Sequence, residues 1–350
     1  MLATQPSAVA DTNPDNSPAG SRLAWKKLIA PTEPFLQAVA ERLREQINAF
    51  ERDIAVYAEY ALTNQGKQLR PALVALSGGA TGKVNEQHVL AAVIIEMVHL
   101  ATLVHDDVMD EASIRRGRPT LAAHWGNEIS VLLGDCLFAN ALKLAASFPT
   151  TEMCRAVSAA TNTVCSGEIL QTQRRRNFEL SRAEYFKAIQ MKTGELFALS
   201  CDLGAYLSGA GAVQRTALRQ YGMAIGTAYQ IYDDCVDLFG SEAVVGKSLG
   251  TDLAKGKLTL PVLIALERAP TAQRAELTLL LQKWESGRFA TLLGVLQSRG
   301  AIEGSCEVVR EHLGAAREKL ALLPDSQSRH GLSALADYLA DQTDALAQPA

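Results

Sequence analysis

The sequence predicts an all-α protein, and three observations support this. From about Leu23 onward, long stretches rich in alanine, leucine and glutamate carry apolar residues at three-and-four spacing, which is the period of a helix. No alternating apolar run is bounded by the turn signals of a β-hairpin. Residues 89–105 and 222–237 are apolar almost all round their helices, as is typical of helices at the centre of a bundle.

Residues 1–22 differ from the rest of the chain. They are rich in Ala, Ser, Pro, Asn and Asp and show no apolar periodicity, so we expect a disordered leader. Residues 23–350 contain no linker and no repeat longer than a short aspartate motif. This part of the chain is therefore expected to form a single domain.

Composition favours a soluble globular protein and argues against several other classes. Of the 350 residues, 48% are hydrophobic and 21% charged, and the formal net charge of -4 argues against nucleic acid as a partner. The six cysteines form no CxxC pair and no cluster at zinc spacing. No apolar run approaches the roughly 18 to 20 residues that span a bilayer, and the N-terminus lacks the order of a signal peptide. We expect a cytoplasmic protein that is not integral to a membrane.

Both apolar helices run into a cluster of aspartates with the pattern DDxxD. The six aspartates are Asp106, Asp107 and Asp110 in HDDVMD, and Asp233, Asp234 and Asp237 in YDDCVD. At about 100° per residue, Asp106 and Asp110 lie one above the other on the same helical face, with Asp107 beside them. The clusters start 127 positions apart (233 minus 106), which would allow two antiparallel helices to face their carboxylates across one cavity.

Carboxylates at this density predict a metal site. Like charges at such spacing repel and weaken a helix, so they need a compensating cation. Hard oxygen ligands suit Mg²⁺, which prefers a few carboxylates together with water and phosphate oxygens. A solvated acidic helix end is the alternative for one cluster, but two clusters that each end a strongly apolar helix favour metal and diphosphate.

Basic residues flank the first aspartate cluster. Lys67 and Arg70 in GKQLRP precede the apolar helix, and Arg115 and Arg116 in ASIRRGRP follow the aspartates. Guanidinium groups bind diphosphate oxygens in pairs, and a lysine supplies a point charge. A solvated basic turn is the alternative for the arginines alone, but acidic and basic clusters together suit metal plus phosphate.

A second basic series surrounds the second cluster. Lys192 and Thr193 lie in MKTGE, and Lys247 and Lys257 lie in GKSLGTDLAKGKLTLP, just after the aspartates. Each lysine taken singly is more typical of a solvated surface, whereas the three together fit a diphosphate pocket. For the arginine run at 174–176 we expect a solvated helix end.

Six motifs in this order resemble the trans-isoprenyl diphosphate synthases, which are polyprenyl synthetases. They are GKQLRP, HLATLVHDDVMDEASIRRGRPT, GEILQ, MKTGELF, YQIYDDCVDLFG and GKSLGTDLAKGKLTLP, and the resemblance runs from about residue 30 to the C-terminus. It implies a large helical bundle around a central cavity, the isoprenoid synthase type I fold, and a homodimer. The family usually reads GGKR where residues 65–68 here are QGKQ; Lys67 and Arg70 are kept.

The resemblance also implies roles for individual residues. About three Mg²⁺ ions would be held by Asp106, Asp107, Asp110, Asp233 and Asp234, and Asp237 is counted with them among the catalytic groups. The allylic diphosphate would be bound or enclosed by Arg115, Lys192, Thr193, Gln230, Lys247 and Lys257, of which Arg115 and Lys192 are also counted as catalytic. The diphosphate of isopentenyl diphosphate would be held by Lys67, Arg70, His99 and Arg116. His99 lies seven residues before Asp106, on the same face. A lone buried histidine is more often structural, and it is the position of His99 in the family's motif that implies a ligand here.

The implied reaction joins an allylic diphosphate to isopentenyl diphosphate. The allylic C–O bond ionises while metal and cationic side chains stabilise the departing diphosphate, and the homoallylic double bond then attacks and loses a proton. No nucleophilic side chain is needed. The protein positions both substrates, neutralises the leaving group and excludes water from the carbocation.

Small residues before the first aspartates predict an open pocket and a product of C25 or longer. Ala101 and Thr102 occupy positions where short-chain members of the family commonly carry an aromatic residue. Val98 and Ile95, further down the helix, are branched but not aromatic. One turn of about 5.4 Å corresponds to roughly one isoprene unit. The alternative is a floor closed by a bulky group of another helix, such as Phe138.

Three other functions remain as alternatives. A short-chain synthase would make farnesyl or geranylgeranyl diphosphate. A class I terpene cyclase typically has an NSE-like second motif and no second diphosphate site, so Lys67, Arg70 and Arg116 argue against it. A non-catalytic partner subunit usually loses one aspartate cluster, and both are intact here.

Overall fold

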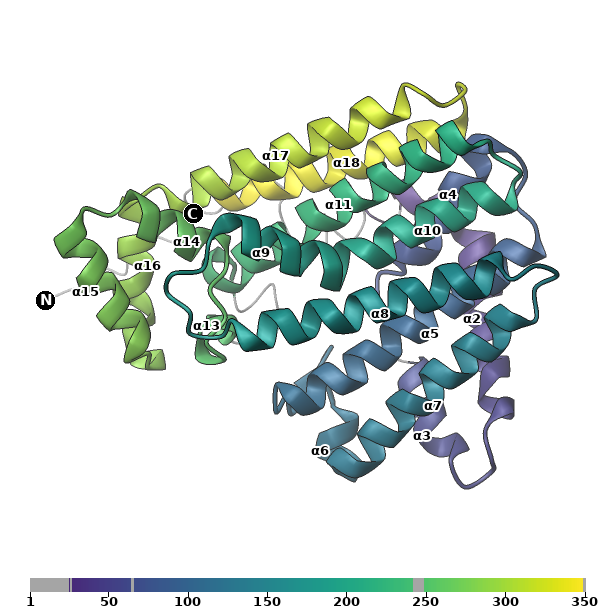
Figure 1. Ribbon diagram of the computed structural model, residues 1–350, viewed down its shortest axis with the longest axis horizontal. Coiled ribbons are helices and arrows are strands. Elements are labelled where there is room, and N and C mark those ends of the chain that lie inside the picture. Colours follow the sequence, from purple (N-terminus) through teal and green to yellow (C-terminus); the bar gives the residue numbers. More distant parts are fainter. Residues whose placement is uncertain (1–24, 26, 64–65, 242–248, 349–350) are drawn as a thin grey trace, which may run out of the picture.

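The computed structural model describes residues 25, 27–63, 66–241 and 249–348, and it is helical almost throughout (Figure 1). The α-helices are α2 (Glu33–Glu45), α3 (Ala55–Thr63), α4 (Leu69–Thr81), α5 (Glu86–Met109), α6 (Leu121–Trp125), α7 (Asn127–Ala146), α8 (Glu152–Gln173), α9 (Arg182–Ile189), α10 (Glu195–Leu207), α11 (Ala212–Phe239), α13 (Thr251–Ala254), α14 (Leu260–Arg268), α15 (Thr271–Gln282), α16 (Phe289–Ser298), α17 (Ala301–Leu320) and α18 (Gln327–Ala347). Short helical turns are η2 (Ala30–Thr32), η3 (Gln46–Ala49), the π-helix η4 (Gln190–Gly194) and η5 (Ser286–Arg288). The predicted all-α class is confirmed, whereas the predicted leader lies outside the described residues.

Helix α5 carries the first aspartates and begins at a reciprocal cap. The N–H of Gln87 donates to Asn85 Oδ1 at 3.0 Å, and the N–H of Asn85 donates to His88 Nδ1 at 3.1 Å. His88 Nε2 lies 3.1 Å from the carbonyl oxygen of Gly204 in α10, which fits a neutral ring with its proton on Nε2. From 91 to 98 every residue of α5 is buried, as its all-round apolar pattern predicts.

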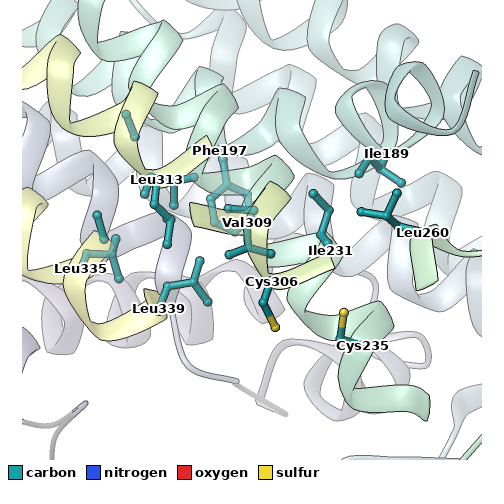
Figure 2. Close-up of a cluster of buried hydrophobic side chains, with 14 of the residues drawn as sticks. Ile189, Phe197, Ile231, Cys235, Leu260, Cys306, Val309, Leu313, Leu335 and Leu339 are labelled. Carbon is teal, nitrogen blue, oxygen red and sulfur yellow. The ribbon is translucent and has the colours of Figure 1, made fainter. Parts of the chain in front are cut away.

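Buried side chains form two cores joined by α10. One core surrounds α11, α14, α17 and α18, and the other surrounds α5, α7 and α8. Figure 2 shows part of the first core, where Ile231 and Cys235 of α11 lie near Cys306 and Val309 of α17. Helix α10 packs closely on α11, because a Cβ at Gly222 would lie only 2.5 Å from a backbone oxygen of α10.

One element departs from the all-helical expectation. After the first aspartates, β1 (Ile114–Arg115) pairs antiparallel with β2 (Arg118–Pro119). Between them Arg116 and Gly117 have φ angles of 52° and 73°, the left-handed conformation that a tight two-residue hairpin turn needs. Strands of two residues are too short to show an alternating pattern, so the sequence carried no strand signal there.

Two described helices are long and apolar enough to cross a membrane by length and composition, although polar residues interrupt the apolar run in each of them. These are α5 and α7. The best window of α5 is 72% buried inside the bundle, as expected for the central helix of a globular core. Only 33% of the best window of α7 is buried. Val131 and Leu132 on α7 are exposed, so this helix has an uncovered apolar face.

Candidate active site

Asp106, in the last turns of α5, contacts Lys192 of η4, which links it to α8. Lys192 Nζ lies 3.3 Å from Asp106 Oδ2, contacts Glu168, and donates to Gln171 Oε1 at 3.2 Å. Burial alone would lower the pKa of Lys192, but Asp106 and Glu168 outweigh it and raise the pKa. Burial raises the pKa of Asp106, with Lys192 opposing it. Lys192 thus supplies a charged ammonium inside an acidic site, and it does so from a π-helical turn, a feature frequent at functional sites.

Three cationic side chains converge on Asp110. Lys255 Nζ and Lys257 Nζ each lie 3.1 Å from Asp110 Oδ2, and Arg175 Nη2 lies 2.8 Å from Oδ1. Burial alone would raise the pKa of Asp110, but Lys257 and Lys255 outweigh it and lower the pKa to about 2. Asp110 is therefore ionised at neutral pH. Lys257 Nζ also lies 3.8 Å from Asp252 Oδ1, so three cations face two carboxylates here. Positive charge is therefore in excess around Asp110, which favours the binding of a diphosphate.

Asp107 has a different partner from its neighbours. Arg115 Nε, at the end of β1, donates to Asp107 Oδ1 at 2.7 Å. Burial raises the pKa of Asp107, and Arg115 opposes that rise. Asp107 therefore fixes the hairpin and orients Arg115 beside the cluster.

The second cluster also splits into different environments. Asp233 is exposed, whereas Asp234 is buried and accepts from Tyr185 OH at 2.6 Å and from Gln230 Nε2 at 2.8 Å. Thr193 Oγ1 donates to Gln230 Oε1 at 2.7 Å, which links η4 to α11. Burial and then the nearby Asp252 raise the pKa of Asp234 well above its usual value.

Asp237 is buried and bound to the segment that follows α11. Thr251 Oγ1 donates to Asp237 Oδ1 at 2.6 Å, and the N–H of Asp252 donates to Oδ2 at 3.1 Å. A few residues later in this segment, Lys257 reaches Asp110, so the C-terminal turns of α5 and α11 meet at the same end of the bundle. The two helices therefore run in the same general direction, and the antiparallel arrangement is wrong. Each cluster ends its helix, so two helices that lie side by side bring both clusters to one end of the bundle when they run in the same direction.

A second basic group lies deeper along α5. The Arg70 guanidinium carbon lies 4.8 Å from the centroid of the Phe197 ring, and Arg70 Nε is buried without a hydrogen-bond partner. Burial lowers the pKa of Arg70, and the buried carboxylate of Glu96 opposes this. Burial, followed by Arg70 and Arg116, depresses the pKa of His99 well below its usual value, so the ring is neutral. These groups surround an unsatisfied buried donor, Arg70 Nε, which suits an anionic ligand.

Lys67 and Arg116 belong to the same region. A Cβ at Gly66 would lie 2.5 Å from Arg116 Nη2, so glycine at this position lets the hairpin arginine approach the segment before α4. Burial lowers the pKa of Lys67, and Asp233 opposes this, which connects Lys67 electrostatically to the second cluster. Predicted site residues from the segment before α4, from α5, from the hairpin and from α11 thus lie in the same region.

The donor set fits Mg²⁺ shared with a diphosphate rather than a metal held by protein alone. Among the described residues, no three His, Cys, Asp or Glu side chains are gathered closely enough to hold a metal ion. Asp106 and Asp110 instead contact lysine ammonium groups, so cations already compensate these carboxylates. All the aspartate donors are hard oxygens, and Mg²⁺ commonly takes only one or two carboxylates and completes its shell with water and phosphate.

Several residues of this site were not predicted from the sequence. The expectation of a solvated helix end at 174–176 is wrong for Arg175, which contacts Asp110, although the run does follow the end of α8. The other unpredicted residues are Glu168, Gln171, Tyr185, Glu96 and Lys255. Glu168 and Gln171 lie in the motif GEILQ, and Lys255 lies two residues before Lys257, so the motifs contained a signal for three of them. Lys247 lies outside the described residues.

The residues predicted to set the length of the product lie on the buried part of α5. Ala101 and Val98 are buried, and Thr102 is half-buried and donates from Oγ1 to the carbonyl oxygen of His99 at 2.7 Å. Phe138 of α7 packs against His105, with ring centroids 5.7 Å apart. Phe138 thus contacts α5 just before Asp106, closer to the C-terminal end of the helix than Ala101.

Comparison with known proteins agrees with this site. Residues 51–291 match the polyprenyl synthetase family. The chain is 32% identical over 321 residues to the octaprenyl diphosphate synthase of Escherichia coli, covering 91% of this chain and 99% of that protein. It is 33% identical over 313 residues to a short chain isoprenyl diphosphate synthase of Methanothermobacter thermautotrophicus, covering 88% and 96%. The crystal structure of a decaprenyl diphosphate synthase from Rhodobacter capsulatus has a TM-score of 0.85 at 32% identity, covering 91% of this chain and 99% of that one. This chain belongs to the polyprenyl synthetase family of trans-isoprenyl diphosphate synthases, and it is a prenyltransferase.

Proposed function

We propose that the enzyme condenses an allylic diphosphate with isopentenyl diphosphate in the space between the two aspartate clusters, and that its product is an all-trans polyprenyl diphosphate of C25 or longer. The convergence of Lys255, Lys257 and Arg175 on Asp110 carries this proposal. Two sequence segments bring three cations to one carboxylate, so the positive charge exceeds what that carboxylate needs. A diphosphate is the ligand that would balance the excess.

The allylic diphosphate is assigned to this cationic group. Lys192, Lys255, Lys257, Arg115 and Arg175 would contact its oxygens. Gln230 and Thr193 would fix the wall formed by α11 and η4. Lys247 is assigned to the same group by resemblance. About three Mg²⁺ ions, which Asp106, Asp107, Asp110, Asp233 and Asp234 would hold, would supply Lewis-acid stabilisation of the departing diphosphate.

Isopentenyl diphosphate is assigned to the deeper basic group formed by Lys67, Arg70, His99 and Arg116. Arg70 Nε is a buried donor without a partner in the described residues, and a diphosphate oxygen would satisfy it. His99 is neutral, so it would act as a hydrogen-bonding group rather than as a further cation. The two basic groups would hold the reacting carbons of both substrates face to face.

The protein's own contribution to the reaction is orientation and charge. Lysine and arginine side chains stabilise negative charge as the allylic C–O bond breaks, and because they are already in place, little reorganisation is needed. Apolar side chains of α5 line the path of the growing chain and keep water from the carbocation. The proton lost at the end passes to the released diphosphate, a base that the reaction itself provides.

Product length is assigned from α5 rather than from the relatives. The names of the relatives include octaprenyl and short chain synthases, so they do not fix the length. Ala101 and Thr102 are small, and neither is aromatic. An open path along α5 would accept five or more isoprene units.

We also propose a cytoplasmic homodimer. The exposed apolar face of α7, with Val131 and Leu132, is the surface assigned to the partner. A relative in Bacillus subtilis, 35% identical over 308 residues, is named heptaprenyl diphosphate synthase component 2, and this name favours an unlike second chain as the alternative partner. Light scattering separates the two: a dimer mass with full activity supports the homodimer, whereas a monomer that is inactive alone supports the two-component enzyme.

The experiment for the activity uses purified protein, Mg²⁺, labelled isopentenyl diphosphate and a series of allylic primers. Incorporation that is abolished by a chelator and restored by Mg²⁺ supports the proposed reaction. Cyclic hydrocarbon formed without isopentenyl diphosphate would instead support a terpene cyclase. No incorporation with any primer would favour a non-catalytic subunit.

A further inference from the structure

Asp237 has surroundings unlike those of the other clustered aspartates. Its exposed fraction is 1%, and Oδ1 accepts from Thr251 Oγ1 at 2.6 Å and from the Thr251 N–H at 3.3 Å. Oδ2 accepts from the Asp252 N–H at 3.1 Å, and the Asp237 carbonyl oxygen accepts from the Gly250 N–H at 2.7 Å. Both carboxylate oxygens are therefore engaged by backbone and side chain of the segment that follows α11.

The segment at 250–257 is tied to the bundle at both ends. Asp237 holds its start, while the Arg176 N–H, just past α8, donates to the Gly256 carbonyl oxygen at 2.7 Å. Within the segment the Lys257 N–H donates to the Asp252 carbonyl oxygen at 2.8 Å. Its helix, α13, has only four residues, too few for helical structure that is stable on its own. The shape of the segment therefore depends on these anchors.

Two lysines project from this segment to the first aspartate cluster. Lys255 Nζ and Lys257 Nζ both lie 3.1 Å from Asp110 Oδ2, across the site from α11. A lysine side chain loses much conformational freedom when it is fixed, so a backbone that is already in place lowers the cost of presenting its ammonium to a ligand. The carboxylate that fixes the backbone thereby affects binding without touching the ligand.

We infer that Asp237 is a positioning residue that holds Lys255 and Lys257 at the allylic diphosphate site, and that it is not a metal ligand. This inference rests on the proposed function, in which these lysines contact the allylic diphosphate. It revises the catalytic role expected from the DDxxD pattern. The third aspartate of the second cluster repeats the sequence spacing of Asp110 but has a different task.

The test compares full-length variants in steady-state kinetics: Asp237→Ala, the double variant Lys255→Ala/Lys257→Ala, and the triple variant that combines them. Asp237→Ala is expected to raise KM for the allylic diphosphate about tenfold and to change KM for isopentenyl diphosphate less than about twofold. The triple variant should match the lysine double variant, because removing the anchor has no effect once the side chains it positions are gone.

Two controls make the result specific. Asp202→Ala removes a comparable structural pair, since Arg215 Nε donates to Asp202 Oδ1 at 2.8 Å, and it is expected to lower the melting temperature without changing either KM. Thr251→Val removes only the 2.6 Å bond to Asp237 and should raise the allylic KM about threefold. If Asp237→Ala does not fold, the allylic KM of Thr251→Val tests the inference in its place.

Calorimetric binding of inorganic diphosphate with Mg²⁺ provides the same comparison without turnover. The wild-type protein could prove inactive in turnover and still bind diphosphate through the two lysines, with weaker binding in Asp237→Ala. That result would contradict the proposed function and support this inference. Equal rises in both KM values, unchanged values in Asp237→Ala, or effects that multiply in the triple variant would each overturn the inference.

Discussion

Replacing Ala101 by phenylalanine should shorten the product, because the growing chain runs down α5 from the aspartates. Ala101 lies five residues before Asp106, which is about 7.5 Å along the helix at about 1.5 Å per residue. Val98 lies about 12 Å from the same aspartate, so the two positions differ by roughly one isoprene unit. A ring at position 101 should stop the chain at C15 to C20, and Val98→Phe should allow about one unit more.

The assay is chromatography of dephosphorylated products made from labelled isopentenyl diphosphate, with thermal unfolding measured in parallel. Forcing a ring into a fully packed site usually costs about 1–3 kcal/mol, whereas a ring that enters an open path costs much less. Shortened products with a small change in stability would support the open path. The reasoning is refuted if a folded Ala101→Phe enzyme makes products of unchanged length, or if Val98→Phe gives the shorter ones.

Three further predictions concern charged and titratable groups. Arg175→Ala should raise KM for the allylic diphosphate about tenfold, because one of the three cations around Asp110 is lost. Arg174 contacts Glu184 instead, so Arg174→Ala should change the same KM less than about twofold. Glu96→Gln should lower the free energy of unfolding by about 1–3 kcal/mol, because Arg70 and Arg116 lose a buried counter-charge. Saturating isopentenyl diphosphate should reduce that loss in denaturant titrations. Burial lowers the pKa of His88, so the folded state binds fewer protons than the unfolded state at acidic pH. His88 therefore costs no stability above about pH 6.5, where the ring is neutral in both states. Below that pH it lowers the free energy of unfolding by at most about 1.4 kcal/mol per pH unit. In His88→Gln the unfolding free energy should therefore depend less on pH between about pH 7.5 and pH 5.5 than in the wild type.

Each of these predictions has an outcome that would contradict it. Equal effects of Arg175→Ala and Arg174→Ala would mean that Arg175 is an ordinary surface cation. A loss of stability in Glu96→Gln that is the same with and without isopentenyl diphosphate would separate Glu96 from the second diphosphate site. Parallel pH curves for wild type and His88→Gln would show that His88 is not the group whose protonation destabilises the fold.

The helices and the two aspartate clusters could be predicted because their signals are local. The segment at 89–105 lies inside α5, and the segment at 222–237 lies inside α11, because both are apolar all round over several turns. The spacing of Asp106 and Asp110 also follows from helical geometry alone. The family and the reaction class were predicted from the resemblance of six motifs in order, and the comparisons confirm both.

The tasks of individual charges could not be predicted, because they depend on partners from distant segments. Asp110 and Asp237 occupy equivalent places in the same pattern, yet lysines contact one and backbone N–H groups contact the other. Arg175 lies in a run of arginines that looked solvated, and only the fold brings it to Asp110. The relative direction of α5 and α11 was equally inaccessible, since the number of residues between two helices does not determine it.

The measurement that tests the central claim most directly is product analysis of the wild-type enzyme with Mg²⁺, labelled isopentenyl diphosphate and farnesyl or geranylgeranyl diphosphate as primer. The site and the small residues of α5 predict elongation to products of C25 or longer. Products that stop at C15 or C20 would contradict the open path while keeping the reaction, and no elongation of any primer would contradict the proposed function itself.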